Sequence, residues 1–291
     1  MTPATALDRL VHWLSAREDM RGAVLVGSRA RTEVPADEWS DTDVLVLTID
    51  PAALLDGDEW VTDAFGGAVL SYTEPTPVAD LRERRVLLPD GTDFDVIPVP
   101  VDRVALLLAR GPALAVLASG YRVLLDKDDV FEDLPARLSE FGAGAGSPVP
   151  WPPPATEVTN LAADYWHHCV WITKRVCRGE LFLAQWTNAV HQRHILLRFA
   201  RWQALARSGG AAQVWYDGRF AEYWAAPETV AALHGSVAGS TPRDVVTALL
   251  GTMRAFAPLS AEVLSAVGRP YPEETDRWIT GWVTDRLAEL T

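Results

Sequence analysis

A glycine- and proline-rich segment at residues 142–154 divides this chain into two parts. It starts with alternating glycine and alanine and ends in Pro150-Trp151-Pro152-Pro153-Pro154, so it is flexible at first and then stiff. Its glycines could also belong to a phosphate loop, but no Lys-Ser or Lys-Thr pair follows them. We therefore predict a linker at 142–154, between one domain at residues 1–141 and another at 155–291.

The first part of the chain alternates between helical patterns and short apolar runs. Apolar residues at three- and four-residue spacing predict a helix over 4–19, residues 101–118 have a helical pattern, and Asp50-Pro51 marks another helix start. The turn Pro89-Asp90-Gly91 joins two predicted strands into a hairpin. The predicted strands cover residues 23–26, 44–47, 85–88, 94–97 and 121–125. This order predicts an α/β domain with a mixed sheet.

Beyond the linker the pattern is helical to the end of the chain. The predicted helices cover residues 155–178, 181–207, 227–238, 242–267 and 272–290. The first of them carries an apolar stripe of Val158, Leu161, Tyr165, Cys169, Ile172 and Val176. The expected fold class is therefore α+β, with an N-terminal α/β domain followed by a C-terminal α-helical bundle domain.

Composition restricts the environment and the ligands. The chain has 291 residues, of which 48% are hydrophobic, but it has neither a signal peptide nor an apolar run of about 20 residues, so we expect no membrane contact. Cys169 and Cys177 lie at helical spacing, and we expect no disulfide and a cytoplasmic location. The net charge of −13 argues against nucleic acid and suits a small cationic substrate, although acidity also serves solubility.

Two aspartates open the second predicted strand. Asp41 and Asp43 are two residues apart, so their carboxylates share one face and repel each other unless a cation lies between them. Asp95, on the hairpin, reaches the same place if its strand lies beside the second one. Mg²⁺ favours carboxylate oxygens together with phosphates, and three carboxylates suit a two-metal phosphoryl-transfer site. Asp93 shares the face of Asp95, but it abuts the turn, so we favour Asp95.

A Gly27-Ser28 pair ends the first predicted strand. Gly27 permits close backbone approach, and Ser28 is expected to open a helix whose free N–H groups receive phosphate. An isolated Asp-X-Asp pair more often belongs to a solvated loop. The ordered combination of strand, Gly-Ser, loop, Ser-Asp-X-Asp and later strand aspartate instead predicts nucleotidyl transfer.

Several motifs resemble one family of enzymes. They are Val26-Gly27-Ser28-Arg29, Ser40-Asp41-Thr42-Asp43, the hairpin from Leu87 to Pro98, Lys174-Arg175 and Arg178-Gly179-Glu180-Leu181. Together they look like the aminoglycoside 6-adenylyltransferase (streptomycin adenylyltransferase) family of the polymerase-β-like nucleotidyltransferases. The resemblance spans most of the chain, and it implies a nucleotidyltransferase domain at 1–141 and a helical substrate-binding domain at 155–291.

The resemblance also implies roles for individual residues. Asp41, Asp43 and Asp95 are expected to be the catalytic residues and the ligands of two Mg²⁺ ions, with Asp95 as the general base. ATP is the expected co-substrate. The residues expected to bind it are Gly27, Ser28, Arg29, Ser40 and Lys174. Two residues before Asp95 the resemblance implies a polar or basic residue, and Asp93 departs from this expectation.

A basic and aromatic face on the first helix of the second domain supports a ligand contact. His167, Trp171, Lys174 and Arg178 share this face in an otherwise acidic chain, although a solvated helix surface has the same pattern. Asp164, Glu180 and Trp171 are the expected contacts of a cationic substrate, because a carboxylate pairs well with a guanidinium. Glu157 and Glu222 are weaker candidates.

Histidines near this helix raise the question of zinc. His167, His168, Cys169, His191 and His194 lie on two neighbouring predicted helices. Their spacing does not repeat across both helices, and His191 and His194 continue into a basic stripe with Arg198 and Arg201. The sequence therefore argues against structural zinc.

The expected function is transfer of AMP from ATP to the 6-hydroxyl of streptomycin, in the cleft between the two domains of a monomer. Such a reaction inactivates the antibiotic. Adenylylation of another aminoglycoside or of a lincosamide is the enzymatic alternative. A nucleotide-binding regulator that has lost turnover is the alternative from another class, although a pure binder does not need three carboxylates.

Overall fold

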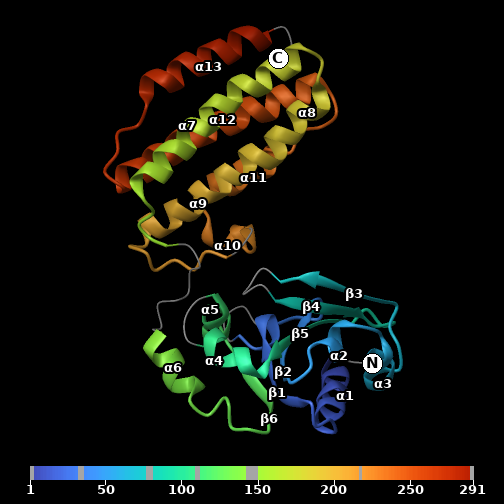
Figure 1. The fold of residues 1–291 in the computed structure, drawn as a ribbon. Helices are drawn as coiled ribbons and strands as arrows, with labels where there is room; N and C mark the ends of the chain where they lie inside the picture. The colour runs from blue at the N-terminus through green and yellow to red at the C-terminus, as the bar shows by residue number, and fades with distance from the viewer. Residues whose placement is uncertain are drawn as a thin grey trace. The chain divides into compact units, whose positions relative to one another are not determined.

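The computed structural model describes residues 3–31, 36–76, 81–108, 112–141, 150–215 and 218–288. The chain forms two compact units, Met1–Gly146 and Ser147–Thr291 (Figure 1). Residues 142–149 of the predicted linker lie outside the described residues, and residues 150–154 lead directly into the first helix of the second unit.

In the described part of the first unit, a mixed sheet has the strand order β3-β4-β5-β2-β1-β6. Its strands are β1 (Met20–Val26), β2 (Thr42–Thr48), β3 (Leu70–Pro75), β4 (Arg82–Leu87), β5 (Asp93–Pro100) and β6 (Arg122–Asp126). Neighbouring strands are antiparallel, except that β2 and β5 run parallel. The mixed sheet predicted from the sequence is therefore confirmed.

Helices cover both faces of this sheet. Because successive side chains of a strand point to opposite faces, β1 supplies Ala23 and Leu25 to one core and Val24 and Val26 to the other. The first core is completed by α1 (Pro3–Ser15), α2 (Ala52–Leu55) and α3 (Glu59–Phe65). The second core is completed by the segment of η2 (Val101–Arg103), α4 (Val104–Leu107), α5 (Pro112–Ala118) and α6 (Leu134–Phe141).

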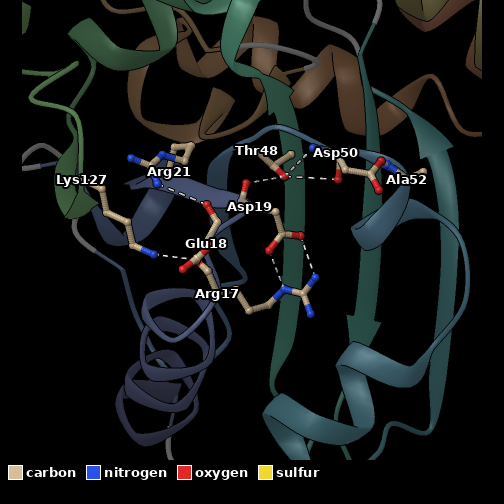
Figure 2. A network of polar contacts seen from close by, with 8 residues as sticks. All are labelled: Arg17, Glu18, Asp19, Arg21, Thr48, Asp50, Ala52 and Lys127. Atoms are coloured by element: carbon tan, nitrogen blue, oxygen red, sulfur yellow. Dashed lines mark hydrogen bonds and ion pairs between the residues drawn. The ribbon is translucent and has the colours of Figure 1, made fainter.

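A polar network closes the sheet at the end where β1 starts and β2 finishes (Figure 2). The Thr48 hydroxyl donates to the carbonyl of Asp19, and Lys127 Nζ donates to the carbonyl of Arg17 over 2.6 Å. Arg17 and Asp19 form an ion pair of 2.6 Å, and Asp50 accepts a hydrogen bond from the N–H of Ala52 at the start of α2. These contacts hold the connections between the strands at this end of the sheet. Asp41, Asp43 and Asp95 lie at the opposite end, where β2 begins.

The described second unit is helical, as predicted. Its elements are α7 (Ala155–Cys177), α8 (Leu181–Trp186), the π-helical segment η3 (Thr187–Gln192), α9 (Arg193–Arg207), α10 (Ala221–Trp224), α11 (Pro227–Gly235), α12 (Pro242–Ala266) and α13 (Glu273–Leu287). Helix α12 begins with a capping box between Thr241 and Asp244. The long helices pack around one hydrophobic core, in which the rings of Tyr165 and Phe256 stack with centroids 3.6 Å apart.

Several predicted elements differ from the structure. The helix predicted over 4–19 ends at Ser15. The described residues of the helix predicted over 101–118 form η2, α4 and α5, and residues 109–111 lie outside the described residues. A single helix was predicted over 181–207, whereas the structure has the π-helical segment η3 between α8 and α9. The sequence analysis also missed α3, β3, α6 and α10.

Two smaller expectations concern cysteines and membranes. Cys169 is buried, Cys177 is exposed, and both are free thiols, so the expected absence of a disulfide agrees with the structure of these two residues. Among the described helices, none combines the length and the apolar character that crossing a bilayer demands.

Candidate active site

Strand pairing brings the predicted carboxylates together. In the parallel pair of β2 and β5, Asp43 lies opposite Asp95, and Asp41 immediately precedes β2. Among the described residues, carboxylate oxygens of Asp41, Asp43 and Asp95 lie within 4.8 Å of one another. The cluster does not include Asp93, which lies opposite Leu87 at the start of β5.

Gly27 forms the wall beside this cluster. It follows Val26, which pairs with Asp43, and its φ of +67° is one that residues with a side chain rarely adopt. A Cβ atom at this position would lie 2.0 Å from Asp43 Oδ2. Only glycine lets the backbone of the turn and the Asp43 carboxylate occupy this space together.

The turn after Gly27 is shorter than predicted. Instead of a helix opened by Ser28, Gly27–Arg29 form a single 3-10 turn, in which the N–H groups of Ala30 and Arg31 bond to the carbonyl of Gly27. The N–H groups of Ala30 and Arg31 therefore have a partner within the turn and are not free to bind phosphate. The buried Ser28 hydroxyl lies 3.5 Å from Asp41 Oδ1, at the limit of a hydrogen bond.

Arg29 and Ser40 fasten the loop that carries Asp41. Arg29 Nε donates to the carbonyl of Asp41 over 2.9 Å, and Arg29 Nη2 donates to the carbonyl of Ser40. The Ser40 hydroxyl in turn donates to Asp37 Oδ1 over 2.9 Å. Both residues were expected to bind ATP, and in this structure their contacts position the backbone around Asp41.

Asp95 is buried and is bonded on one side only. Its side chain is 4% exposed, and its Oδ2 lies 2.9 Å from Arg85 Nη2. Among the described residues, its Oδ1 has no hydrogen-bond partner. Burial raises the pKa of Asp95 to about 7, because the ionised form loses hydration, while Arg85 favours that form and Asp43 opposes it.

These features fit a divalent cation. A buried carboxylate oxygen without a partner, beside two further carboxylates, is unfavourable in free energy. A bound cation removes this penalty, because it pairs with the negative charges. The donors are all oxygens, as Mg²⁺ prefers. Asp41, Asp43 and Asp95 are therefore a possible Mg²⁺ site on the chemistry of the residues present.

The sequence analysis missed Arg85. It lies opposite Asp95 on β4 and also contacts Glu74 and Glu83, at 2.6 and 3.1 Å. The hairpin pattern contained the necessary signal, because counting back across Pro89-Asp90-Gly91 places Arg85 on the strand that pairs with Asp95. Since the guanidinium favours the ionised carboxylate, Arg85 orients Asp95 and limits the rise of its pKa.

The buried Asp95 should make the stability of the metal-free protein depend on pH. Its pKa is about 7 in the folded state and 3.8 in the unfolded state, so the folded state holds the extra proton between these values. This carboxyl group therefore destabilises the fold progressively from about pH 4 to pH 7, by roughly 4 kcal/mol at most. Urea unfolding in EDTA should show a shallower decline for Asp95→Asn than for the wild type between pH 5 and pH 8.

Mg²⁺ provides the complementary measurement. At pH 8 it should raise the unfolding free energy of the wild type and have little effect on Asp95→Asn. Equal pH slopes for the two proteins would contradict the assigned ionisation of Asp95, whatever their absolute stabilities.

The remaining predicted residues lie in the second unit. Lys174 is exposed near the end of α7, and Arg175 packs over the ring of Trp171 at 4.4 Å. Glu180 forms an ion pair of 2.6 Å with Arg175. Asp164 contacts His168 and His191 at 2.9 Å each. The weaker candidates also have partners, because Glu157 pairs with Arg198 and Glu222 lies 3.4 Å from His234.

A pocket in the second unit contains further polar residues that the sequence analysis did not assign. It has a volume of about 730 Å³ and combines apolar and titratable side chains. Its polar and aromatic lining includes Trp186, His191, His194, Glu222 and His234. Of these, Glu222 was a weak substrate-binding candidate, and the others gave no regular spacing from which a pocket could be predicted.

A mixed sheet that combines a glycine-serine turn with clustered carboxylates is typical of metal-dependent nucleotidyltransferases. Comparison with known proteins agrees, because residues 2–286 match the family described as streptomycin adenylyltransferase. The chain therefore belongs to this family of aminoglycoside adenylyltransferases.

Individual relatives are distant. Aminoglycoside 6-adenylyltransferase of Bacillus subtilis (strain 168) is 23% identical over 201 residues, which are 66% of this chain and 65% of that protein. The chain thus spans slightly less than two thirds of this curated relative. A crystal structure of an aminoglycoside 6-adenyltransferase from Bacillus subtilis has 16% identity, a TM-score of 0.45, and coverage of 98% of each chain.

Proposed function

We propose that this protein transfers AMP from ATP to a hydroxyl group of an aminoglycoside, with the 6-hydroxyl of streptomycin as the acceptor. The observation that supports this most is the cluster of Asp41, Asp43 and Asp95 beside Gly27. The family match supports the reaction class, and the name of the Bacillus subtilis relative, aminoglycoside 6-adenylyltransferase, supports position 6. The net charge of −13 favours a cationic acceptor.

The residues of the site divide the work of the proposed reaction. Asp41 and Asp43 hold Mg²⁺, which when bound neutralises charge on the phosphates and orients them. Asp95 also contributes to the Mg²⁺ site and accepts the proton of the acceptor hydroxyl through Oδ1, the oxygen that has no hydrogen-bond partner among the described residues. The hydroxyl oxygen bonds to the α-phosphorus as the bond to the β-phosphate breaks, and pyrophosphate leaves.

Positioning residues support these groups. Arg85 holds Asp95 Oδ2, which leaves Oδ1 for the site. Arg29 fixes the carbonyls of Ser40 and Asp41, so that the Asp41 carboxylate is held beside the turn. Gly27 and Ser28 offer their turn to the phosphates of ATP, and Lys174 supplies a positive charge for the triphosphate from α7.

The function is tested with purified protein, ATP and Mg²⁺, together with streptomycin, other aminoglycosides and a lincosamide. Pyrophosphate release should depend on streptomycin, and mass spectrometry of the product should find one added AMP at the 6-hydroxyl. Release with another acceptor alone would overturn the choice of streptomycin. Measurable ATP binding without release for any acceptor would favour the nucleotide-binding regulator.

Replacing Lys174 by Ala is expected to raise the KM for ATP by about 10-fold, because one charge-assisted phosphate contact is lost. The effect on kcat should be smaller. Steady-state kinetics at varied ATP measures both values, with Arg243→Ala, a change of an exposed arginine at the start of α12, as the control for a general loss of positive charge. An equal rise of KM in the two variants would remove the specific role of Lys174.

A further inference from the structure

Two histidines and an aspartate of the second unit converge on one point. Asp164 and His168 lie one turn apart on α7, and His191 lies on η3. His168 Nδ1 is 2.9 Å from Asp164 Oδ1, and His191 Nε2 is 2.9 Å from Asp164 Oδ2. One nitrogen of each histidine and one oxygen of Asp164 all lie within 4.8 Å of one another. The three side chains thus face a common volume small enough for one ion.

The π-helical segment explains why the sequence did not reveal this cluster. A π-helical turn shifts the residues around it out of the 3.6-residue repeat by which a helix face is predicted from sequence. In η3 both His191 and Gln192 face α7, because Gln192 Nε2 donates to the carbonyl of Tyr165 over 3.0 Å while His191 contacts Asp164. Asn188 anchors the segment through a hydrogen bond of 3.0 Å to the carbonyl of Ser236. Such π-helical turns are frequent at functional sites.

The donor set selects a particular class of metal. Two imidazole nitrogens and one carboxylate oxygen suit Zn²⁺, Co²⁺ or Ni²⁺, whereas Mg²⁺ prefers the oxygen-only cluster of the first unit. All three side chains are partly exposed, so an ion can enter and water can complete its coordination. His168 Nδ1 also lies 3.0 Å from the carbonyl oxygen of Asp164, so ligation through this nitrogen requires that its proton move to Nε2 and that the contact with the carbonyl be lost. His191 must likewise carry its proton on the nitrogen that faces away from the ion.

We propose that Asp164, His168 and His191 bind one divalent transition-metal ion, with Zn²⁺ as the expected occupant. The ion joins α7 to the π-helical segment between α8 and α9, and in doing so stabilises the helical unit. Without the ion, the hydrogen bonds between Asp164 and the two histidines hold the site in place. This proposal assigns Asp164 to the ion instead of to the cationic substrate that the sequence analysis expected it to contact, and it changes no step of the proposed transfer reaction.

The test uses the full chain without a histidine tag, stripped with a chelator and then titrated with Co²⁺ in excess Mg²⁺. Excess Mg²⁺ occupies the oxygen-only cluster, and the visible absorption of Co²⁺ reports nitrogen ligation. We expect one equivalent of Co²⁺ to bind, Zn²⁺ to displace it, and Zn²⁺ to raise the Tm. Binding that is not saturable, or a spectrum of hydrated Co²⁺ only, would overturn the proposal.

Matched variants assign the ligands. His191→Gln and His168→Gln keep a hydrogen-bonding side chain but should weaken Co²⁺ binding by about 10-fold or more and abolish the Zn²⁺-dependent rise of Tm. His194→Ala, an exposed histidine on α9 outside the cluster, should bind Co²⁺ like the wild type. Circular dichroism of the metal-free variants shows whether they fold. Unchanged binding in folded His191→Gln, or equal loss in His194→Ala, would place the metal elsewhere and refute the site.

Discussion

Replacing Asp95 by Asn is expected to lower kcat for AMP transfer by about 10³-fold, because the variant loses both the base and one metal-binding oxygen. Asn has nearly the same shape, so Arg85 and the packing around β5 should remain in place. Pyrophosphate release at saturating ATP and acceptor measures the change, and circular dichroism checks the fold. The loss should not be recovered at high pH, since the amide cannot ionise.

Asp93→Asn is the matched control for this prediction. Asp93 lies two residues before Asp95 on the same strand, and burial also raises its pKa, but it is not part of the carboxylate cluster. We expect its kcat to stay within about 10-fold of the wild type. Near-normal turnover of a folded Asp95→Asn, or an equally severe loss in Asp93→Asn, would show that the division of work between the two aspartates has been assigned wrongly.

Local sequence patterns were sufficient for the sheet and for the aspartates. Apolar runs bounded by polar or turn residues predicted β1, β2, β5 and β6. The prediction over 85–88 found only the end of β4, because that strand begins with the charged residues Arg82, Glu83 and Arg84. The Pro89-Asp90-Gly91 turn fixed the hairpin that carries Asp95. The edge strand β3 was missed, because its apolar and polar residues alternate over only four positions, Leu70 to Thr73, before Glu74 and Pro75 end the pattern.

Contacts between distant segments could not be read from the sequence. The register that places Asp43 opposite Asp95 depends on parallel pairing of β2 with β5, which share no turn. The cluster of Asp164, His168 and His191 depends on the π-helical segment η3. No residue type predicts where a π-helical turn lies within a helical pattern. In both cases the sequence analysis identified the residues, but their arrangement in space became known only from the structure.

Gly27 is needed both for the backbone conformation of its turn and for the position of the Asp43 carboxylate. Replacing it by Ala puts a Cβ atom 2.0 Å from Asp43 Oδ2 and 2.8 Å from its Cγ. The clash is with the end of a side chain, so the Asp43 carboxylate can rotate away and the fold can survive. That rotation removes Asp43 from the carboxylate cluster, which the proposed reaction needs.

Gly27→Ala is therefore expected to lower kcat by about 10²-fold or more, since displacement of a catalytic group by about 1 Å has effects of this size. Its free energy of unfolding should fall only by the cost of an alanine in the left-handed conformation, roughly 1–2 kcal/mol. Gly268→Ala is the matched control, because its φ of +70° is nearly the same and nothing lies within 4 Å of its added Cβ. It should lose similar stability and keep full turnover. If both variants lost the same small fraction of activity, the contact between Gly27 and Asp43 would not matter for catalysis, and the position of Asp43 would have to be maintained by other residues.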